Sequence, residues 1–279
     1  MWVIASIANA IFNVLLAPFR ALHPLIGILV LSILTGVVMV FIFGKTSNQR
    51  AIHSTKSKLK AHIAEIWLFR DDLLQMLLAT VRVLGHTSRY FFHSLRPLIF
   101  IFVPVLIILV MIGMRYEHRP FVAGERAFVS VQVNDPTWAQ GDRLALTGTD
   151  GVAVTSPPLR ILAEKEIDWQ IEARAPGRHE LTLTTPNGEV TKEIVVAAEQ
   201  DAPLVPLAPM RGNAFSGAFL QFPAEPPLPG GSGIRLIDVV GWPHREMAVF
   251  GLGVHWLVAF FLLSMAAGFA VKDLFGVEV

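Results

Sequence analysis

The chain has 279 residues, of which 53% are hydrophobic and only 16% are charged, and its mean hydropathy is +0.54. This composition excludes an ordinary soluble globular protein and predicts a polytopic membrane protein. The formal net charge is only +1, and the lack of cysteine excludes structural disulfides and thiolate metal sites.

Residues 1–22 form an apolar segment with one polar stripe. Ser6, Asn13 and Arg20 recur at a spacing of seven, and Asn9 follows Ser6 by about one helical turn. We therefore expect an amphipathic helix that lies in the outer membrane interface, with a helix that crosses the membrane as the alternative. The segment lacks the positive start of a signal peptide, so cleavage is not expected.

Three uncharged apolar runs, 24–44, 98–114 and 247–271, have the length of membrane-spanning helices, which take about 20 residues. They predict transmembrane helices over 23–44, 98–114 and 246–272. Residues 45–97 hold nine Lys and Arg against three Asp and Glu, whereas residues 115–245 hold twelve against sixteen. The positive-inside rule places 45–97 and the tail 273–279 in the cytoplasm. Residues 115–245 are then periplasmic or extracellular.

Residues 45–97 show two amphipathic helical periods and predict a helical hairpin, with Gly85 ending or bending its second helix. Asp71 and Asp72 lie at the turn, where capping of the second helix is favoured over an acid/base pair. The basic residues Lys56, Lys58 and Lys60 predict a solvated face near anionic lipid rather than a nucleic-acid site.

From residue 115 the pattern changes to a period of two. Residues 115–200 contain short alternating runs separated by turn signals, and they predict an all-β, immunoglobulin-like sandwich. The runs are AFVSVQVN, RLALTG, EIDWQIEA, HELTLTT and EVTKEIVVA. Residues 201–245 are rich in proline and glycine and predict a linker, with one further strand at IRLIDVV.

The order of these segments resembles that of the Oxa/YidC superfamily of membrane protein insertases, including its short three-span relatives. LSILTGVVMVFIF and SKLKAHIAEI resemble the first span and first hairpin helix, LFRDDLLQMLLATVRVLG the hairpin turn and second helix, and RPLIFIFVPVLIIL the entry to the second span. The resemblance implies an α-helical membrane protein with three transmembrane helices, an N-terminal interfacial helix and a cytoplasmic hairpin, here with an external β-domain insertion. Bacterial members carry an arginine in the first span, inside a groove that faces the cytoplasm. Met39 occupies that place here.

Weakly polar residues in the first and third spans are candidates to line such a groove: Ser32, Thr35, Met39, His255 and Ser264. His255 is the ionisable side chain well inside an apolar run, which makes it a functional candidate. No enzyme signature stands out, and we expect no catalytic residue, cofactor or metal.

Two functions fit these features. The first is an insertase-like or chaperone-like protein that assists membrane protein insertion or assembly without nucleotide, with the hairpin residues Lys56, Lys58, Lys60, Asp71 and Asp72 receiving the client. The alternative is a non-enzymatic scaffold that presents the external β-sandwich to partners. The expected partners are membrane lipids, transmembrane client segments or other membrane subunits, and an external protein, with no nucleic acid bound. A bacterial inner membrane is the expected location.

Overall fold

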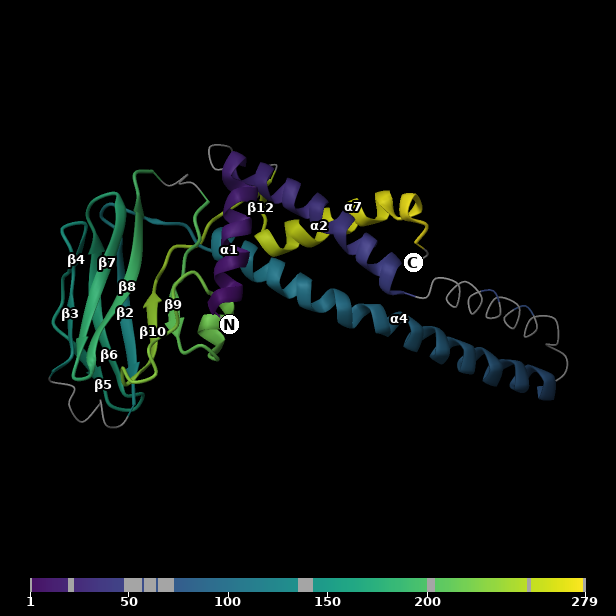
Figure 1. Cartoon of the computed structure of the whole chain (residues 1–279), viewed down its shortest axis with the longest axis horizontal. Helices are drawn as coiled ribbons and strands as arrows, with labels where there is room; N and C mark the ends of the chain where they lie inside the picture. Colours follow the sequence, from purple (N-terminus) through teal and green to yellow (C-terminus); the bar gives the residue numbers. More distant parts are fainter. Residues whose placement is uncertain are drawn as a thin grey trace. The chain divides into compact units, whose positions relative to one another are not determined.

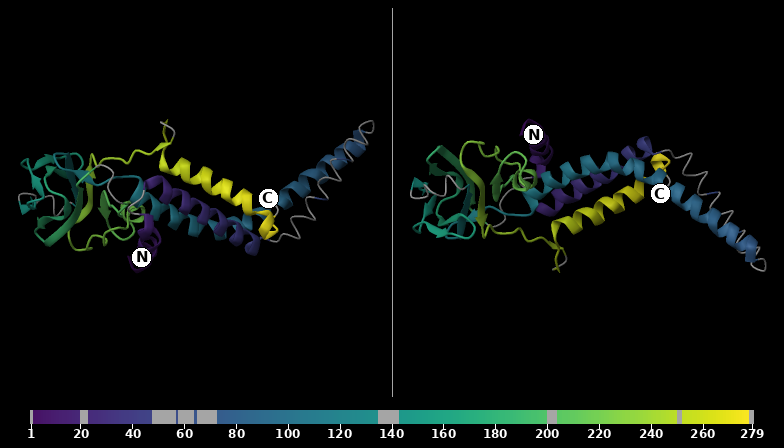
Figure 2. Two further views of the ribbon diagram at one scale, coloured as in Figure 1. Left: turned by 90° about the horizontal axis from the view of Figure 1, so that it is seen from above. Right: turned by 90° about the horizontal axis from the view of Figure 1, so that it is seen from below.

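The computed structural model describes residues 2–19, 23–47, 57, 64, 73–134, 143–199, 204–249 and 252–277. The chain divides into two compact units (Figures 1 and 2). The β unit comprises Met1–Gly27 and Ile107–Trp256, and the helical unit comprises Ile28–Leu106 and Leu257–Val279. The hairpin residues Lys56, Lys58, Lys60, Asp71 and Asp72 lie outside the described residues.

The long helices of the described part of the chain are α1 (Trp2–Leu16), α2 (Pro24–Thr46), α4 (Leu73–Tyr116) and α7 (Trp256–Val271). A short 3-10 turn follows α1 (η1, Ala17–Phe19) and another follows α7 (η3, Asp273–Phe275). Within the described residues, three segments are long and apolar enough to cross a membrane: Trp2–Phe19, Pro24–Thr46 and Leu98–Tyr116. α7 is equally apolar but has only 16 residues.

Helix α4 is continuous over 44 residues, which corresponds to about 66 Å. The boundary expected between 45–97 and 98–114 is therefore not a break, and neither Gly85 nor Pro97 ends the helix. A proline removes one backbone hydrogen bond and can be accommodated inside a membrane helix. A glycine lowers helix propensity without forbidding the helix.

The third apolar run becomes helical later than expected. Ala248–Val249 (β11) and Leu252–Gly253 (β12) form a small antiparallel pair, closed by a hydrogen bond from the Val254 N–H to the Met247 carbonyl. Helix α7 then begins at Trp256 rather than at residue 246. His255 consequently precedes the helix and does not lie inside it.

Each of the five alternating runs forms a strand. One sheet has the order β1 (Phe121–Val122), β8 (Gly188–Ala197), β7 (Gly177–Thr185), β3 (Ala145–Thr147). The other has the order β4 (Val152–Val154), β6 (Glu166–Ala173), β2 (Arg126–Val133), β10 (Ile234–Val240), β9 (Met210–Gly212), with β5 (Leu159–Ile161) also paired to β6. Val129, Trp169, Leu181 and Ile194 belong to one buried core that draws on both sheets.

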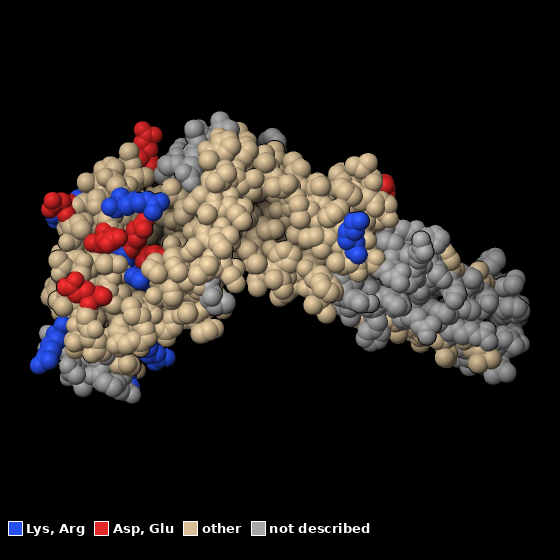
Figure 3. Space-filling model, in the orientation of Figure 1, with Lys and Arg blue, Asp and Glu red and all other residues tan. Residues whose placement is uncertain are grey.

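The segment expected to be a linker, 201–245, belongs in large part to this β region. Strand β10 lies between β2 and β9, so the sheet would be incomplete without it. The short helix α6 (Gly217–Gln221) is capped by the Ser216 hydroxyl, which accepts a hydrogen bond from the Phe219 N–H. On the face drawn in Figure 3, charged side chains gather over the strands and are almost missing from the described helix surface.

Candidate functional site

An open groove of about 400 Å³ lies within the helical unit. Residues of α2, α4 and α7 line it, and nearly all of them are apolar. They are Thr35, Gly36, Met39 and Val40 of α2, Val105 of α4, and Phe260, Phe261, Leu262, Ser264, Met265, Gly268, Phe269 and Lys272 of α7 and the residue that follows it.

Two glycines hold α2 against α7 along one side of the groove. A Cβ placed on Gly36 would collide with the Ser264 carbonyl oxygen and would lie 3.0 Å from the Gly268 backbone nitrogen. A Cβ on Gly268 would lie 3.4 Å from the Val40 side chain. Small residues at these positions permit the close approach of the two backbones.

The polar groups of the groove are few. The Ser264 hydroxyl donates a hydrogen bond to the Phe261 carbonyl at 3.1 Å, so it is satisfied by its own helix. Lys272 is the only charged residue among the described lining residues, and its Nζ lies 5.6 Å from the centre of the Phe269 ring. The groove is therefore an apolar trough with one cation.

The structure brings together three of the five predicted groove residues, Thr35, Met39 and Ser264. Ser32 lies one turn before Thr35 and is fully buried, and its hydroxyl has no hydrogen-bond partner among the described residues. His255 is exposed, precedes α7 and is not a lining residue.

In the β unit, Asn9 and Asn13 of the polar stripe of α1 contact Arg115. Arg115 is completely buried and donates hydrogen bonds to the Oδ1 atoms of Asn9 and Asn13, the latter at 2.8 Å. A third bond, also 2.8 Å, reaches the Met111 carbonyl. These contacts hold α1 across the C-terminal turns of α4 (Figure 1).

Two histidines join the chain leaving α4 to the chain entering β11. His118 and His244 form an isolated antiparallel bridge, and their rings stack with centres 4.5 Å apart. Burial lowers the pKa of His118 to about 4, and the neighbouring His244 adds to the effect. Burial raises the pKa of Glu117, while His244 and His255 oppose that shift.

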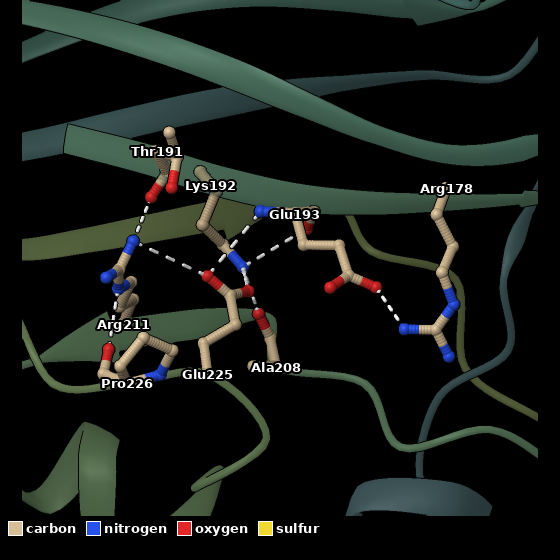
Figure 4. Close-up of polar contacts among 8 residues, drawn as sticks. All are labelled: Arg178, Thr191, Lys192, Glu193, Ala208, Arg211, Glu225 and Pro226. Carbon is tan, nitrogen blue, oxygen red and sulfur yellow. Dashed lines mark hydrogen bonds and ion pairs between the residues drawn. The ribbon is translucent and has the colours of Figure 1, made fainter. Parts of the chain in front are cut away.

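A buried ionic cluster fastens residues 208–226 to β8 (Figure 4). Lys192, only 1% exposed, contacts the Glu225 carboxylate and the Ala208 carbonyl. Arg211 donates to the Thr191 and Pro226 carbonyls and lies 3.8 Å from Glu225. Desolvation lowers the pKa of Arg211, and Glu225 opposes that shift.

The sequence analysis did not single out Lys192, Arg115 or Lys272, although sequence features indicated a structural role for the first two. In EVTKEIVVA, Lys192 occupies the inward register shared with Val190 and Ile194, so its burial could have been expected. Arg115 directly follows an apolar run, and its guanidinium group can donate hydrogen bonds to the asparagine side chains of the polar stripe of α1. Lys272 gave no such signal, because a lysine after a span usually marks only topology.

Among the residues that the structure describes, no three His, Asp or Glu side chains are arranged to hold a metal ion. Comparisons of the chain with protein-family models, with characterised proteins and with solved structures find no match.

Proposed function

We propose that this protein is an insertase-like or chaperone-like membrane protein that shelters transmembrane client segments during insertion or assembly, without nucleotide. The observation that carries the proposal is the apolar groove between α2, α4 and α7. A transmembrane segment that waits outside the bilayer exposes apolar side chains to water, which costs roughly 25 cal/mol for each Å² of apolar surface. An apolar groove covers that surface until the segment reaches the lipid. The likeness of residues 1–114 to the Oxa/YidC superfamily supports the same function.

The chemistry of the groove favours apolar clients. Met39 stands where bacterial insertases carry an arginine, and Lys272 is the one cation among the described lining residues. The proposed mechanism therefore depends on shielding an apolar segment rather than on attracting an acidic one.

The proposed orientation follows the charges. Residues 45–97 lie in the cytoplasm and 115–245 outside, in a bacterial inner membrane, with the two-sheet region as an external, immunoglobulin-like domain. The client meets the hairpin first and then the groove.

The test is insertion of a short single-span client into liposomes that contain the purified protein. Met39→Trp fills the groove and should reduce the gain in insertion over empty liposomes. Leu34→Trp is the matched control, because Leu34 is on the same helix, is 43% exposed and does not line the groove. No gain with the native chain, or equal activity in the two variants, would refute the proposal.

A scaffold that presents the external domain is the second candidate. Phe128 and Val240 are register partners on β2 and β10, so they project from the same face of the sheet, and they are 48% and 50% exposed. This pair suits an apolar contact with an external protein. In affinity purification, Phe128→Ser with Val240→Ser should then release a partner present at fixed stoichiometry. Crosslinking to many unrelated nascent membrane proteins would exclude a pure scaffold.

A further inference from the structure

The groove of the helical unit has the form of a site for an amphiphilic molecule. Its volume of about 400 Å³ lies within the roughly 300–1,000 Å³ typical of small-molecule sites. The Ser264 hydroxyl is occupied by the Phe261 carbonyl. A polar group placed along the trough would lose its hydration with little compensation, so the occupant of the trough is a hydrocarbon chain.

The cation lies at one end of this trough. Lys272 follows Val271, the last residue of α7, and its flexible stem lets the ammonium group reach the groove and the membrane surface. A hydrocarbon chain beside a single cation matches an anionic amphiphile by both shape and charge.

A second lysine lies near the same end of the helical unit. Lys45 is in the last turn of α2, with its Nζ 5.9 Å from the centre of the Phe41 ring. Phe41 contacts Phe275 with ring centres 6.1 Å apart. The end of α2 and the residues after α7 are thus neighbours, so Lys45 and Lys272 lie near the same end of this unit.

We propose that the groove binds one acyl chain of an anionic phospholipid from the surrounding bilayer, with the lipid phosphate at Lys272. Anionic lipids gather at basic residues on the cytoplasmic leaflet, and the end of α7 carries the cation that selects among headgroups. This site exists in the resting protein and requires no client. Its test is therefore independent of insertase activity.

The experiment uses the full chain in phosphatidylcholine liposomes that contain a trace of photoactivatable lipid. Two probes carry the same diazirine-labelled acyl chains, one on phosphatidylglycerol and one on phosphatidylcholine. Crosslinked peptides are mapped by mass spectrometry. Phosphatidylglycerol should crosslink to groove residues of α2 and α7 more strongly than phosphatidylcholine.

Lys272→Gln should lower the phosphatidylglycerol signal about fivefold, the factor that corresponds to roughly 1 kcal/mol for one lysine near an anionic lipid. Lys272→Arg should retain it. Lys45→Gln is the matched control, because it removes the same charge near the same end but Lys45 does not line the groove. Equal loss in the two glutamine variants, equal crosslinking of the two lipids, or crosslinks outside the groove would overturn the proposal.

A second variant tests the place of the acyl chain. Met265 lines the groove and is 56% exposed, so Met265→Trp should fill the trough and weaken crosslinking of the phosphatidylglycerol probe to α2. Val258→Trp, at a position of α7 that is 50% exposed and does not line the groove, should leave that crosslinking unchanged. Unchanged crosslinking in Met265→Trp would place the chain elsewhere.

Discussion

The ion pairs of the β unit differ in what they contribute to stability. Glu225→Ala leaves Lys192 buried beside Arg211 without its carboxylate, and breaking a buried pair in this way costs about 3–5 kcal/mol. Thermal unfolding in detergent should show a clear drop in Tm. Replacing both residues, Lys192→Met with Glu225→Leu, should recover most of the loss.

The matched control is the surface pair Arg178–Glu193, whose charged atoms lie 2.6 Å apart with side chains 57% and 31% exposed. Arg178→Gln should change the free energy of unfolding by about 0–1 kcal/mol. A similar Tm loss for Arg178→Gln and Glu225→Ala would contradict the assignment of the buried cluster as the stabilising one.

The lowered pKa of His118 predicts that the stability of the fold depends on pH. Its pKa is about 4 in the fold and 6.5 in the unfolded chain, so the folded protein binds fewer protons between these values. Stability is therefore fully present above pH 6.5 and is lost as pH falls to 4 and below, with a total of about 3 kcal/mol. His118→Phe should flatten this part of the Tm-against-pH curve. The neighbouring groups His244 and Glu117 are common to both proteins, so an unchanged curve would exclude His118 as the source.

At the scale of elements, the contact between α2 and α7 depends on Gly36. Gly36→Ala forces the two backbones apart and should cost about 1–3 kcal/mol by overpacking. Gly85→Ala is the matched control, because nothing lies within 4 Å of a Cβ there and alanine should stabilise the helix by up to about 1 kcal/mol. The two variants should shift Tm in opposite directions, and a neutral Gly36→Ala would refute the close packing.

Helix α1 makes contacts along its whole length: with α6 near its start, with the end of α4 in its middle and with the start of α2 at its end. Trp2 meets Phe219 with ring centres 6.2 Å apart, Asn9 and Asn13 hold Arg115, and Leu16 lies beside Gly27. If α1 crossed the membrane, only one of its ends could lie at the membrane surface beside the β region. We therefore expect α1 to lie along the membrane surface.

This orientation is measurable with nitroxide labels on the exposed residues Val3 and Val14. A surface helix gives both labels nearly the same depth in the bilayer. A helix that crosses the bilayer separates them by about 16 Å along its axis. Collision with oxygen and with a water-soluble nickel complex reports each depth, and a large difference would restore the spanning alternative.

The strands were predictable because alternation is a local property: Val190, Ile194 and the other inward residues of β8 are recognisable within one run of sequence. The partner of Lys192 was not predictable from the sequence, since Glu225 lies 33 residues away and is brought near only by the fold.

The groove was predictable only in part. Thr35 and Met39 share a face of α2 by their spacing, whereas Lys272 joins them only through the packing of α7. The start of α7 was misjudged because an apolar run alone does not exclude the short β11–β12 pair.

At the scale of the whole molecule, the orientation of the chain can be tested on a clean background, because the sequence contains no cysteine. Ser57→Cys and Leu162→Cys each place one thiol at an exposed position, with Leu162 79% exposed. The excess of basic residues in 45–97 predicts that Ser57 faces the cytoplasm and that Leu162 lies outside. A membrane-impermeant maleimide should label Leu162→Cys in intact spheroplasts, and Ser57→Cys only after permeabilisation. The reverse pattern would invert the orientation and place both the lysine end of the groove and the β region on the wrong sides for the proposed function.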